Sequence, residues 1–493
     1  MAKGRDNWLL TPSAMGEVDA AAAASGIDSF GLMEKAGQAV AAAVLKLFPA
    51  GERFVVLCGP GNNGGDGYVA ARALQESGAA IALYHLGDPS KLKGDAATAR
   101  SCCPVPAEAL ETYFPMQGDV IVDAIFGAGL ARSVPPVVVD IVRRVDEAGL
   151  PVVAVDLPSG IDGRTGAVMG AAFKARHTVT FMTRKPGHLL LPGRLHCGSV
   201  ETVDIGIPFR LVEAKEDRLF VNGPQEWRTA MPTADAAAHK FRRGHLTVFS
   251  GPVTATGAAR LAAAAGLKAG AGLVTIASPA DAVAANAAHL TAVMLKAVET
   301  ENDLADYLRD ERRSVFVLGP GFGVGPKACV FTAAIAAAGR HLVLDADGIT
   351  AFAEDPHPLF SAFAGGASRL VLTPHEGEFA RLFPDLADDP ALSKVDRARQ
   401  AAARANAAVV YKGADSVIAA PDGRAVINEN APASLATAGS GDVLAGIIGG
   451  LLAQGVPAFE AAAAGVWLHG DAASKAGASL TAETLINHID RWH

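Results

Sequence analysis

The chain has 493 residues, a hydrophobic share of 50% and a net charge of −8. This much apolar material can form sizeable cores, so a globally disordered chain is excluded. The acidic balance disfavours a protein that binds nucleic acid by neutralising phosphates. No run of about 18 uncharged apolar residues predicts a membrane span. We therefore expect neither a nucleic-acid partner nor a membrane partner.

The cysteines indicate a cellular compartment. No two of them form a Cys-x-x-Cys pair, and an odd, sparse set in a chain of this size is typical of a reducing cytoplasm. The polar, charged N-terminal segment 1–10 does not resemble a secretory signal. We expect a cytoplasmic protein that forms a homo-oligomer. The cysteines are Cys58, Cys102, Cys103, Cys197 and Cys329.

The first half of the chain alternates short β-branched runs with alanine-rich helical stretches. Fully apolar runs of this length are typical of buried strands in a parallel sheet. Their alternation with helices predicts a doubly wound α/β fold. The runs are 54–58, 81–86, 120–126, 152–156, 178–182 and 200–205.

Segment 209–235 interrupts this pattern with a cluster of charges followed by Asn222-Gly223-Pro224. We predict a first domain at 1–215, a linker at 216–237 and a second domain at 238–493. The turn Pro421-Asp422-Gly423 predicts a hairpin between 416–419 and 425–427, and a long helix is expected at 442–454. The second half is therefore expected to be another α/β domain with a mixed edge. Its other strand-like runs are 246–250, 273–277, 315–318, 342–345, 370–373 and 409–412.

A glycine-rich loop follows the run 54–58 and reads Gly59-Pro60-Gly61-Asn62-Asn63-Gly64-Gly65-Asp66-Gly67. Such a strand-to-helix turn places backbone N–H groups and a helix N-terminus against a ligand, and this suits a phosphate. It satisfies Gly-x-Gly-x-x-Gly, but the acid that a dehydrogenase needs at the end of the second strand is missing. The paired amides and Asp66 add polar groups where chemistry could occur. A tight turn without a ligand is the alternative.

Two further strand ends carry polar side chains, Asp123 on one and Asp156 and Ser159 on the other. Ligands of open α/β sheets bind beyond the carboxyl ends of the strands. Asn63, Asp123 and Ser159 could therefore converge on one hard cation through oxygen ligands. Helix capping by Asp123 and Ser159 is the alternative interpretation.

Several strings together resemble the NAD(P)H-hydrate epimerase family over about residues 10–208. The resemblance implies a Rossmann-like three-layer α/β/α domain that interconverts the R and S forms of hydrated NADH and NADPH. It implies a potassium ion held by Asn63, Asp123 and Ser159, and Asp156 is our candidate for proton transfer. The strings are Met33-Glu34-Lys35-Ala36-Gly37, the loop through Asp66, Asp123–Gly129, Val155–Gly163, and Lys185-Pro186-Gly187 through Pro208. The residues expected to contact the hydrate are Asn62, Asn63, Gly64, Gly65, Asp66, Gly127, Ala128, Gly129, Leu130, Ala131, Arg132, Ser133 and Asp156.

A second small-residue loop, Ala436-Thr437-Ala438-Gly439-Ser440-Gly441-Asp442, leads directly into the predicted helix at 442–454. Its N–H groups and the helix dipole would form an anion hole for a terminal phosphate. Asp442 could act as a base on a hydroxyl beside that phosphate. An acid that merely suits the helix dipole is the alternative. No Gly-Lys dipeptide occurs in the chain, so a P-loop is excluded.

This loop resembles the anion hole of the ribokinase-like superfamily. Five further motifs occur in order in the second half: Gly270-Ala271-Gly272, Gly319-Pro320-Gly321-Phe322-Gly323, Leu344-Asp345-Ala346-Asp347-Gly348, Thr373-Pro374-His375-Glu376-Gly377-Glu378 and Lys412-Gly413-Ala414-Asp415-Ser416. Their order resembles the ADP- or ATP-dependent NAD(P)H-hydrate dehydratase family over about residues 238–490. Ala438, Ser440, Glu376 and Ala255 depart from the family pattern. The resemblance implies a ribokinase-like α/β domain, with magnesium accompanying ADP or ATP. The hydrate would contact Ala258, Gly321, His375 and Asp442, and the nucleotide would contact Lys412, Gly413, Ala414, Asp415, Ser416 and Gly441.

These resemblances predict a bifunctional repair enzyme. It would epimerise the hydrates of NADH and NADPH, and it would dehydrate the S form with ADP or ATP, releasing AMP or ADP and phosphate. A ribokinase-type kinase with a regulatory first domain is one alternative, and a ligand-gated interaction scaffold is another. Repair of a mixed R,S pool needs both activities, so their fusion in one chain favours the repair enzyme.

Overall fold

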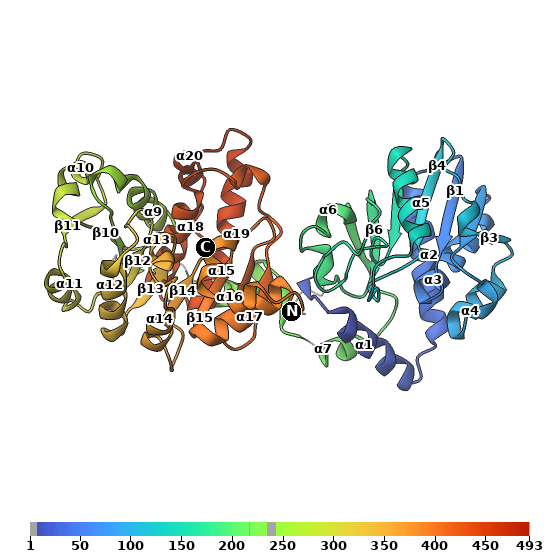
Figure 1. The fold of residues 1–493 in the computed structure, drawn as a ribbon, viewed down its shortest axis with the longest axis horizontal. Helices are drawn as coiled ribbons and strands as arrows, with labels where there is room; N and C mark the ends of the chain where they lie inside the picture. Colours follow the sequence, from blue (N-terminus) through green and yellow to red (C-terminus); the bar gives the residue numbers. More distant parts are fainter. Residues whose placement is uncertain (1–6, 216, 234–242, 493) are drawn as a thin grey trace. The chain divides into compact units, whose positions relative to one another are not determined.

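The computed structural model describes residues 7–215, 217–233 and 243–492. It divides into two compact units, Met1–Leu219 and Phe220–His493, which Figure 1 colours from blue to green and from green to red. One sheet belongs mainly to each unit, and helices cover it. No helix in the described ranges is long and apolar enough to cross a membrane.

A parallel sheet of seven strands forms the centre of the first unit, in the order β3-β2-β1-β4-β5-β6-β7. Each predicted run of the first half forms a strand. We did not predict β3, because its sequence Ala-Glu-Ala has no β-branched residue and it lies at the sheet edge. The strands are β1 (Arg53–Cys58), β2 (Ile81–His85), β3 (Ala107–Ala109), β4 (Asp119–Ala124), β5 (Val152–Val155), β6 (His177–Phe181) and β7 (Ser199–Val203).

Helices cover both faces of this sheet (Figure 1), so the expected three-layer α/β/α architecture is confirmed. Successive strand residues point to opposite faces. Val55 and Leu57 therefore share a core with α5 (Pro136–Glu147), whereas Cys58 faces Gly67 of α3 (Asn62–Glu76). The other helices are α1 (Pro12–Ala24), α2 (Ser29–Leu47), α4 (Gly94–Cys102), α6 (Arg194–Cys197) and α7 (Phe209–Glu213).

The order in which the strands are added reverses at β1. β1 pairs with β2 on one side and with β4 on the other, and both pairs are parallel. In open α/β sheets such a switch point opens a crevice at the carboxyl ends of the strands. Gly59 follows β1 there, and a Cβ at this position would lie 1.8 Å from the carbonyl oxygen of Ile125. Only glycine allows the two loops to approach this closely.

A sheet of ten strands forms the centre of the second unit, in the order β11-β10-β9-β12-β13-β14-β15-β16-β17-β8. The strands from β11 to β15 are parallel, whereas β16 and β17 form an antiparallel hairpin. The predicted hairpin and mixed edge are therefore confirmed. We did not predict β11, which has no β-branched residue. The strands are β8 (Leu219–Val221), β9 (His245–Phe249), β10 (Leu273–Ser278), β11 (Met294–Ala297), β12 (Arg313–Leu318), β13 (His341–Leu344), β14 (Leu370–Leu372), β15 (Ala407–Tyr411), β16 (Val417–Ala419) and β17 (Ala425–Ile427).

Small residues let the helices of the second unit pack closely. The predicted long helix is α18 (Ser440–Ala453), which packs against α9 (Thr256–Lys268). A Cβ on Gly446 would lie 2.1 Å from the carbonyl oxygen of Ala262, so only glycine allows this contact. The remaining helices are α8 (Pro224–Trp227), α10 (Val283–Ala287), α11 (Glu301–Leu308), α12 (Pro326–Ala337), α13 (Asp347–Thr350), α14 (His357–Ala362), α15 (Glu376–Leu382), α16 (Pro384–Ala387), α17 (Lys394–Ala405), α19 (Ala458–Ala476) and α20 (Ala482–Asn487).

The segment 216–237, which we expected to be a linker, contributes to the second domain. Its described part contains β8 and α8, and β8 forms one edge of the second sheet. The Asn222 N–H donates to the carbonyl oxygen of Ile427 at 2.8 Å. The three residues of β8 are apolar and buried, which explains why they join a sheet although charges precede them. Residues 216 and 234–237 lie outside the described ranges.

Candidate functional sites

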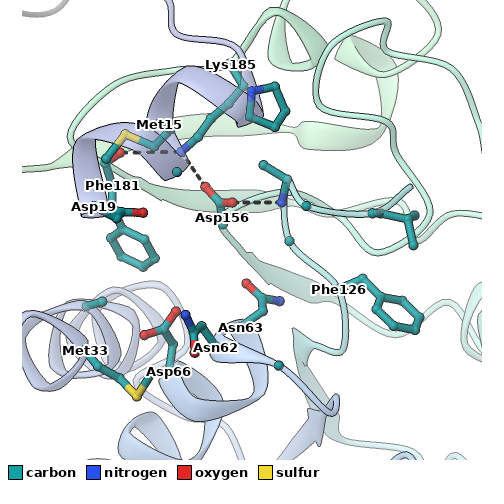
Figure 2. Close-up of a pocket in the computed structure, with 18 of the residues that line it drawn as sticks. Met15, Asp19, Met33, Asn62, Asn63, Asp66, Phe126, Asp156, Phe181 and Lys185 are labelled. Atoms are coloured by element: carbon teal, nitrogen blue, oxygen red, sulfur yellow. Dashed lines mark hydrogen bonds and ion pairs between the residues drawn. The ribbon is translucent and has the colours of Figure 1, made fainter. Parts of the chain in front are cut away.

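A cavity of about 730 Å³ lies in the first unit, at the carboxyl ends of β1, β4 and β5. Figure 2 shows Asn62, Asn63, Asp66 and Asp156 around it. Gly127, Ala128, Gly129, Leu130, Ala131 and Arg132 also line it. Of the other residues expected to contact the hydrate, Gly64 and Gly65 are buried in α3 and Ser133 is exposed, and none of the three is among the lining residues.

Asp156 occupies an unusual backbone conformation directly after β5. Its φ is +64°, which is rare for a residue with a side chain. The His188 ring maintains this conformation, because Nδ1 accepts from the Lys185 N–H at 2.9 Å and Nε2 donates to the Asp156 carbonyl oxygen at 2.8 Å. Burial lowers the pKa of His188 to about 4, so the ring is neutral at pH 7. Strain held in this way is common at functional sites.

The Asp156 carboxylate is fixed by three donors. The Lys185 ammonium donates to Oδ1 at 2.6 Å and the Thr180 hydroxyl donates to the same oxygen at 2.9 Å. The Ala128 N–H donates to Oδ2 at 2.9 Å. Figure 2 shows the bond from Lys185 to Asp156 as a dashed line. These bonds orient the carboxylate at the cavity wall.

Asp156 and Asp66 have opposite electrostatic environments within the same cavity. Burial opposes the charge of Asp156, but the Lys185 ammonium outweighs it and lowers the pKa of Asp156 to about 2. Burial raises the pKa of Asp66 well above its usual value, and the charge of Asp156 adds to this shift. At neutral pH the cavity therefore contains one ionised carboxylate and one carboxyl group that retains its proton more readily. Such divergent pairs separate the base from the acid.

Asp123 and Ser159 meet beneath the cavity. The Ser159 N–H donates to Asp123 Oδ2 at 2.6 Å and the Ser159 hydroxyl donates to Oδ1 at 2.5 Å. With its amide oriented to satisfy both neighbours, Asn63 donates to the Val155 carbonyl at 3.1 Å and accepts from the Gly127 N–H at 3.3 Å. Burial raises the pKa of Asp123 to about 6.

These residues fit a bound potassium ion. Asn63, Asp123 and Ser159 supply amide, carboxylate and hydroxyl oxygens, which are the donors that hard cations prefer. Within the described ranges no lysine or arginine pairs with Asp123, which is fully buried. A buried carboxylate without a positive partner favours a cation beside it. The interpretation of Asp123 and Ser159 as capping residues alone does not explain this buried charge.

Lys185, Thr180 and His188 contact Asp156, and the sequence alone did not indicate this. Lys185 is 3% exposed and Thr180 is fully buried. The string Lys185-Pro186-Gly187 was part of the resemblance, but nothing in its spacing indicated a contact with a carboxylate 29 residues earlier. One signal was available: a threonine and a lysine near the end of β6 lie beside the end of β5, because the carboxyl ends of neighbouring parallel strands meet at one edge of the sheet.

In the second unit the small-residue loop leads into α18 as predicted. Gly439 precedes the helix with φ +82°, a conformation that glycine adopts readily. The first N–H groups of a helix have no partners within it, so they are available to an anion. Asp442 lies in this first turn. A Cβ on Gly441 would lie 3.8 Å from both Asp345 Oδ2 and Lys412 Nζ, so the loop adjoins an acidic and a basic group.

Lys412 links several acidic groups below the loop. Its ammonium lies 2.8 Å from Asp345 and 3.8 Å from Glu378. Burial raises the pKa of Asp442 to about 6, Asp345 and Asp347 add to the increase, and Lys412 opposes it. Asp442 can therefore change between its acid and base forms near neutral pH.

Of the other residues predicted to contact the hydrate in the second unit, Ala258 and Gly321 lie together, and His375 caps a helix. Gly321, at φ +64°, lies against Ala258, because a Cβ on Gly321 would be 3.4 Å from that methyl group. His375 caps α15, where its Nδ1 accepts from the N–H groups of Gly377 and Glu378 at 3.0 and 3.3 Å. This cap is a structural role, but the ring stays 56% exposed and can still contact a ligand.

The predicted nucleotide segment forms a turn after β15. The Gly413 N–H donates to the Ser416 hydroxyl at 3.1 Å, and that hydroxyl donates to the Gly413 carbonyl at 2.7 Å. Asp415 pairs with Lys394 at 2.5 Å. Ala414 lies within the same turn. This segment follows Lys412, so it adjoins the small-residue loop on the β15 side.

Two family models match the chain, one in each unit. The model described as NAD(P)H-hydrate dehydratase matches residues 246–491. The model described as YjeF-related protein N-terminus matches residues 29–187. A solved ADP/ATP-dependent NAD(P)H-hydrate dehydratase from Bacillus subtilis, co-crystallised with ATP and Mg²⁺, is 25% identical with a TM-score of 0.47, and the match covers 55% of this chain and 95% of that one.

Curated relatives match over nearly the whole length. A bifunctional NAD(P)H-hydrate repair enzyme from Moorella thermoacetica is 36% identical, over 95% of this chain and 92% of the relative. One from Thermofilum pendens is 34% identical, over 93% and 91%. The chain belongs to the family of bifunctional NAD(P)H-hydrate repair enzymes.

Proposed function

We propose that this protein repairs hydrated NADH and NADPH in two steps. The first unit interconverts the R and S hydrates, and the second unit dehydrates the S hydrate with ADP or ATP as co-substrate. Family membership supports the pairing of activities. The observation that carries the proposal is the presence of two separate sites, each with a carboxylate of shifted pKa beside a glycine-rich helix start.

Epimerisation requires the C–O bond at the hydrated carbon to break and to form again on the other face of the ring. In our proposal Asp66 donates a proton to the departing hydroxyl, which leaves as water. Asp156 accepts a proton from the water that adds to the opposite face, and a proton passes back from Asp156 to Asp66 before the next turnover, so no net proton is consumed. The opposite pKa shifts of the two carboxyls support this division. The other predicted contact residues, from Asn62 to Ser133, would bind and orient the hydrate.

A potassium ion would be held by Asn63, Asp123 and Ser159. Bound there it would neutralise the buried Asp123 carboxylate and fix the turns after β1, β4 and β5. These turns carry Asp66, Gly127 and Asp156 on the cavity wall, so the ion would act on the geometry of the cavity.

In the second unit Asp442 removes the proton from the hydroxyl of the S hydrate, and that oxygen attacks the terminal phosphorus of ADP or ATP. AMP or ADP leaves, while the N–H groups of Gly441 and Asp442 hold the charge of the transferred group. The phosphate ester is a far better leaving group than hydroxide. Its loss as phosphate, with a proton from the neighbouring carbon, restores the double bond of the dihydropyridine ring.

The co-substrate would lie against the turn Lys412–Ser416 and Gly441, and Ala258, Gly321 and His375 would position the hydrate. Magnesium would accompany the nucleotide. Among the described residues no group of three or more acidic, histidine or cysteine side chains is placed to hold a metal ion, so the ion would be held mainly by the phosphates of the nucleotide, as is usual for magnesium. When bound, the ion would neutralise phosphate charge.

We also propose a reducing compartment such as the cytoplasm, because all five cysteines are free. The adjacent Cys102 and Cys103 remain unpaired, and Cys58, Cys103 and Cys197 are buried. Buried thiols of this kind are typical of proteins that fold without disulfides.

The direct test follows the recovery of dihydropyridine absorbance from a mixed R,S pool of hydrated NADH. The protein is supplied with potassium, magnesium and ADP, and the assay is repeated with ATP. We expect recovery of the whole pool with release of phosphate. Recovery that stops at the S fraction would contradict an active epimerase, and a stable phosphorylated product would indicate a kinase instead.

A further inference from the structure

A second cavity, of about 960 Å³, lies along the outer face of α9 in the second unit. Its size falls in the range of about 300–1,000 Å³ that is usual for small-molecule sites. One side is α9 from Gly257 to Lys268. The other sides are the loop at 289–293 and the segment that begins with α20. None of the predicted contact residues lines it.

The cavity begins beside the small-residue loop of the dehydratase site. A Cβ on Gly439 would lie 2.9 Å from both Leu261 and Ala482, so the loop packs against the helices that flank the cavity. Gly257 lines the cavity and directly precedes Ala258, a predicted hydrate contact. From Gly257 to Lys268 the helix rises about 16 Å at 1.5 Å per residue. The cavity therefore extends away from Asp442 along α9.

The lining combines an apolar floor with basic side chains. Leu261, Leu267 and Ile486 form part of the floor, and Arg260, Lys268 and Arg491 also line the cavity. In the described part of the chain, Arg260 has no ion pair and donates no hydrogen bond, although it is only partly exposed. Glu483 is the acidic residue among the lining residues. This composition suits a flat apolar group joined to phosphates.

The order of strands separates this cavity from the co-substrate. The proposed nucleotide segment follows β15, four strands from β9. The cavity adjoins α9, which follows β9, and the loop that leads into the edge strand β11. Asp442 lies in the first turn of α18, which packs against α9, β12 and β13, so a hydrate whose ring lies at Asp442 has α9 on the side opposite the nucleotide segment. The cavity occupies that side.

We propose that this cavity binds the adenosine diphosphate half of the hydrated dinucleotide, with Arg260 at the diphosphate. The inference rests on the proposed dehydratase function and adds a binding site for the half of the substrate that does not react. Affinity for the dinucleotide would come from the cavity, and the chemical step would come from Asp442.

The test uses the S hydrates of NADH and of reduced nicotinamide mononucleotide, which lacks the adenosine half. Dehydration by the full chain is measured with saturating ADP. We expect Arg260→Ala to raise KM for the dinucleotide hydrate about tenfold, with kcat changed less than about twofold. KM for the mononucleotide hydrate should not change. Arg309→Ala, which alters an arginine that is 81% exposed on another helix, is the matched control.

Ala264→Phe provides an independent variant if Arg260→Ala does not fold, because it fills the cavity from the α9 side. It should also raise KM only for the dinucleotide hydrate. If the wild-type protein turns over and KM is unchanged in the variants, this inference alone is overturned. The same holds if KM rises equally for both hydrates. Absence of turnover by the wild-type protein would overturn the proposed function, and this inference with it.

Discussion

The two sites place the same side chain in opposite electrostatic surroundings. Asp156 in the first unit has an ammonium 2.6 Å away, and its pKa is lowered to about 2. Asp442 in the second unit has other carboxylates as neighbours, while Lys412 lies 2.8 Å from Asp345 instead. Burial and those carboxylates raise the pKa of Asp442 to about 6. Asp156 directly follows β5, Asp442 lies in the first turn of α18, and each borders a ligand loop, so the residue type does not decide their protonation.

This difference matches the two reactions. A base that must deprotonate a hydroxyl for attack on phosphorus is most effective when its pKa lies near the working pH. The carboxylate that accepts a proton from the adding water must instead be ionised and in place before the water adds, and Lys185 and Thr180 ensure both. Each site can be altered alone, and the other site in the same chain then serves as an internal control.

The largest effect is expected from Asp442→Asn. The amide cannot accept the hydroxyl proton, so dehydration should fall about 10³-fold. Epimerisation, measured by chromatographic separation of the R and S hydrates, should remain within about twofold. Asp385→Asn, at an exposed position on α16, is the control. Loss of both activities, or of neither, would count against separate sites.

Lys185→Met should make Asp156 resemble Asp442. Without the ammonium, burial would raise the pKa of Asp156, and epimerisation should fall about 10²-fold at pH 7. Loss of one partner of a buried pair should also lower the free energy of unfolding, by about 3 kcal/mol. Epimerase assays and denaturant unfolding check the two effects. Lys174→Met removes an exposed lysine from an ion pair in the same unit and should change neither.

The two activities should differ in their pH dependence. Asp442 is protonated below about pH 6, so kcat/KM for dehydration should fall about tenfold per pH unit below that value and level off above it. Asp156, with a pKa of about 2, stays ionised throughout this range. Epimerisation should therefore show no decrease near pH 6 that is due to Asp156. ADP is kept saturating at each pH, and identical profiles for the two activities would refute the contrast.

The smallest effect is expected at the proposed potassium site. Replacement of potassium by tetramethylammonium, which is too large for that site, should lower epimerisation about threefold to tenfold. In Asp123→Asn this dependence on potassium should disappear, because the charge that holds the ion is lost. Dehydration of the pure S hydrate, with magnesium constant, should respond to neither change. A response of the same size in both activities would place the potassium effect elsewhere.

Much of the fold was predictable because the signals are local. The runs at 54–58 and 246–250 are apolar and β-branched, and each became a central strand of its sheet. Edge strands β3 and β11 were missed because they are short and mostly exposed. The described part of the expected linker joins the second sheet through β8, since three buried apolar residues outweigh the charges that precede them.

The positions of the ligand loops can be read from the amino-acid sequence. Glycine is needed where φ is +82° at Gly439 and where two loops nearly touch at Gly59, and such requirements are visible in a sequence. The groups that face each carboxylate, in contrast, follow from the way the chain folds. Lys185 reaches Asp156 from the end of the neighbouring strand β6, and Asp345 reaches the loop before Asp442 from a distant part of the chain. A pKa depends on such neighbours in space, and so does the cavity along α9, which segments far apart in the sequence enclose together.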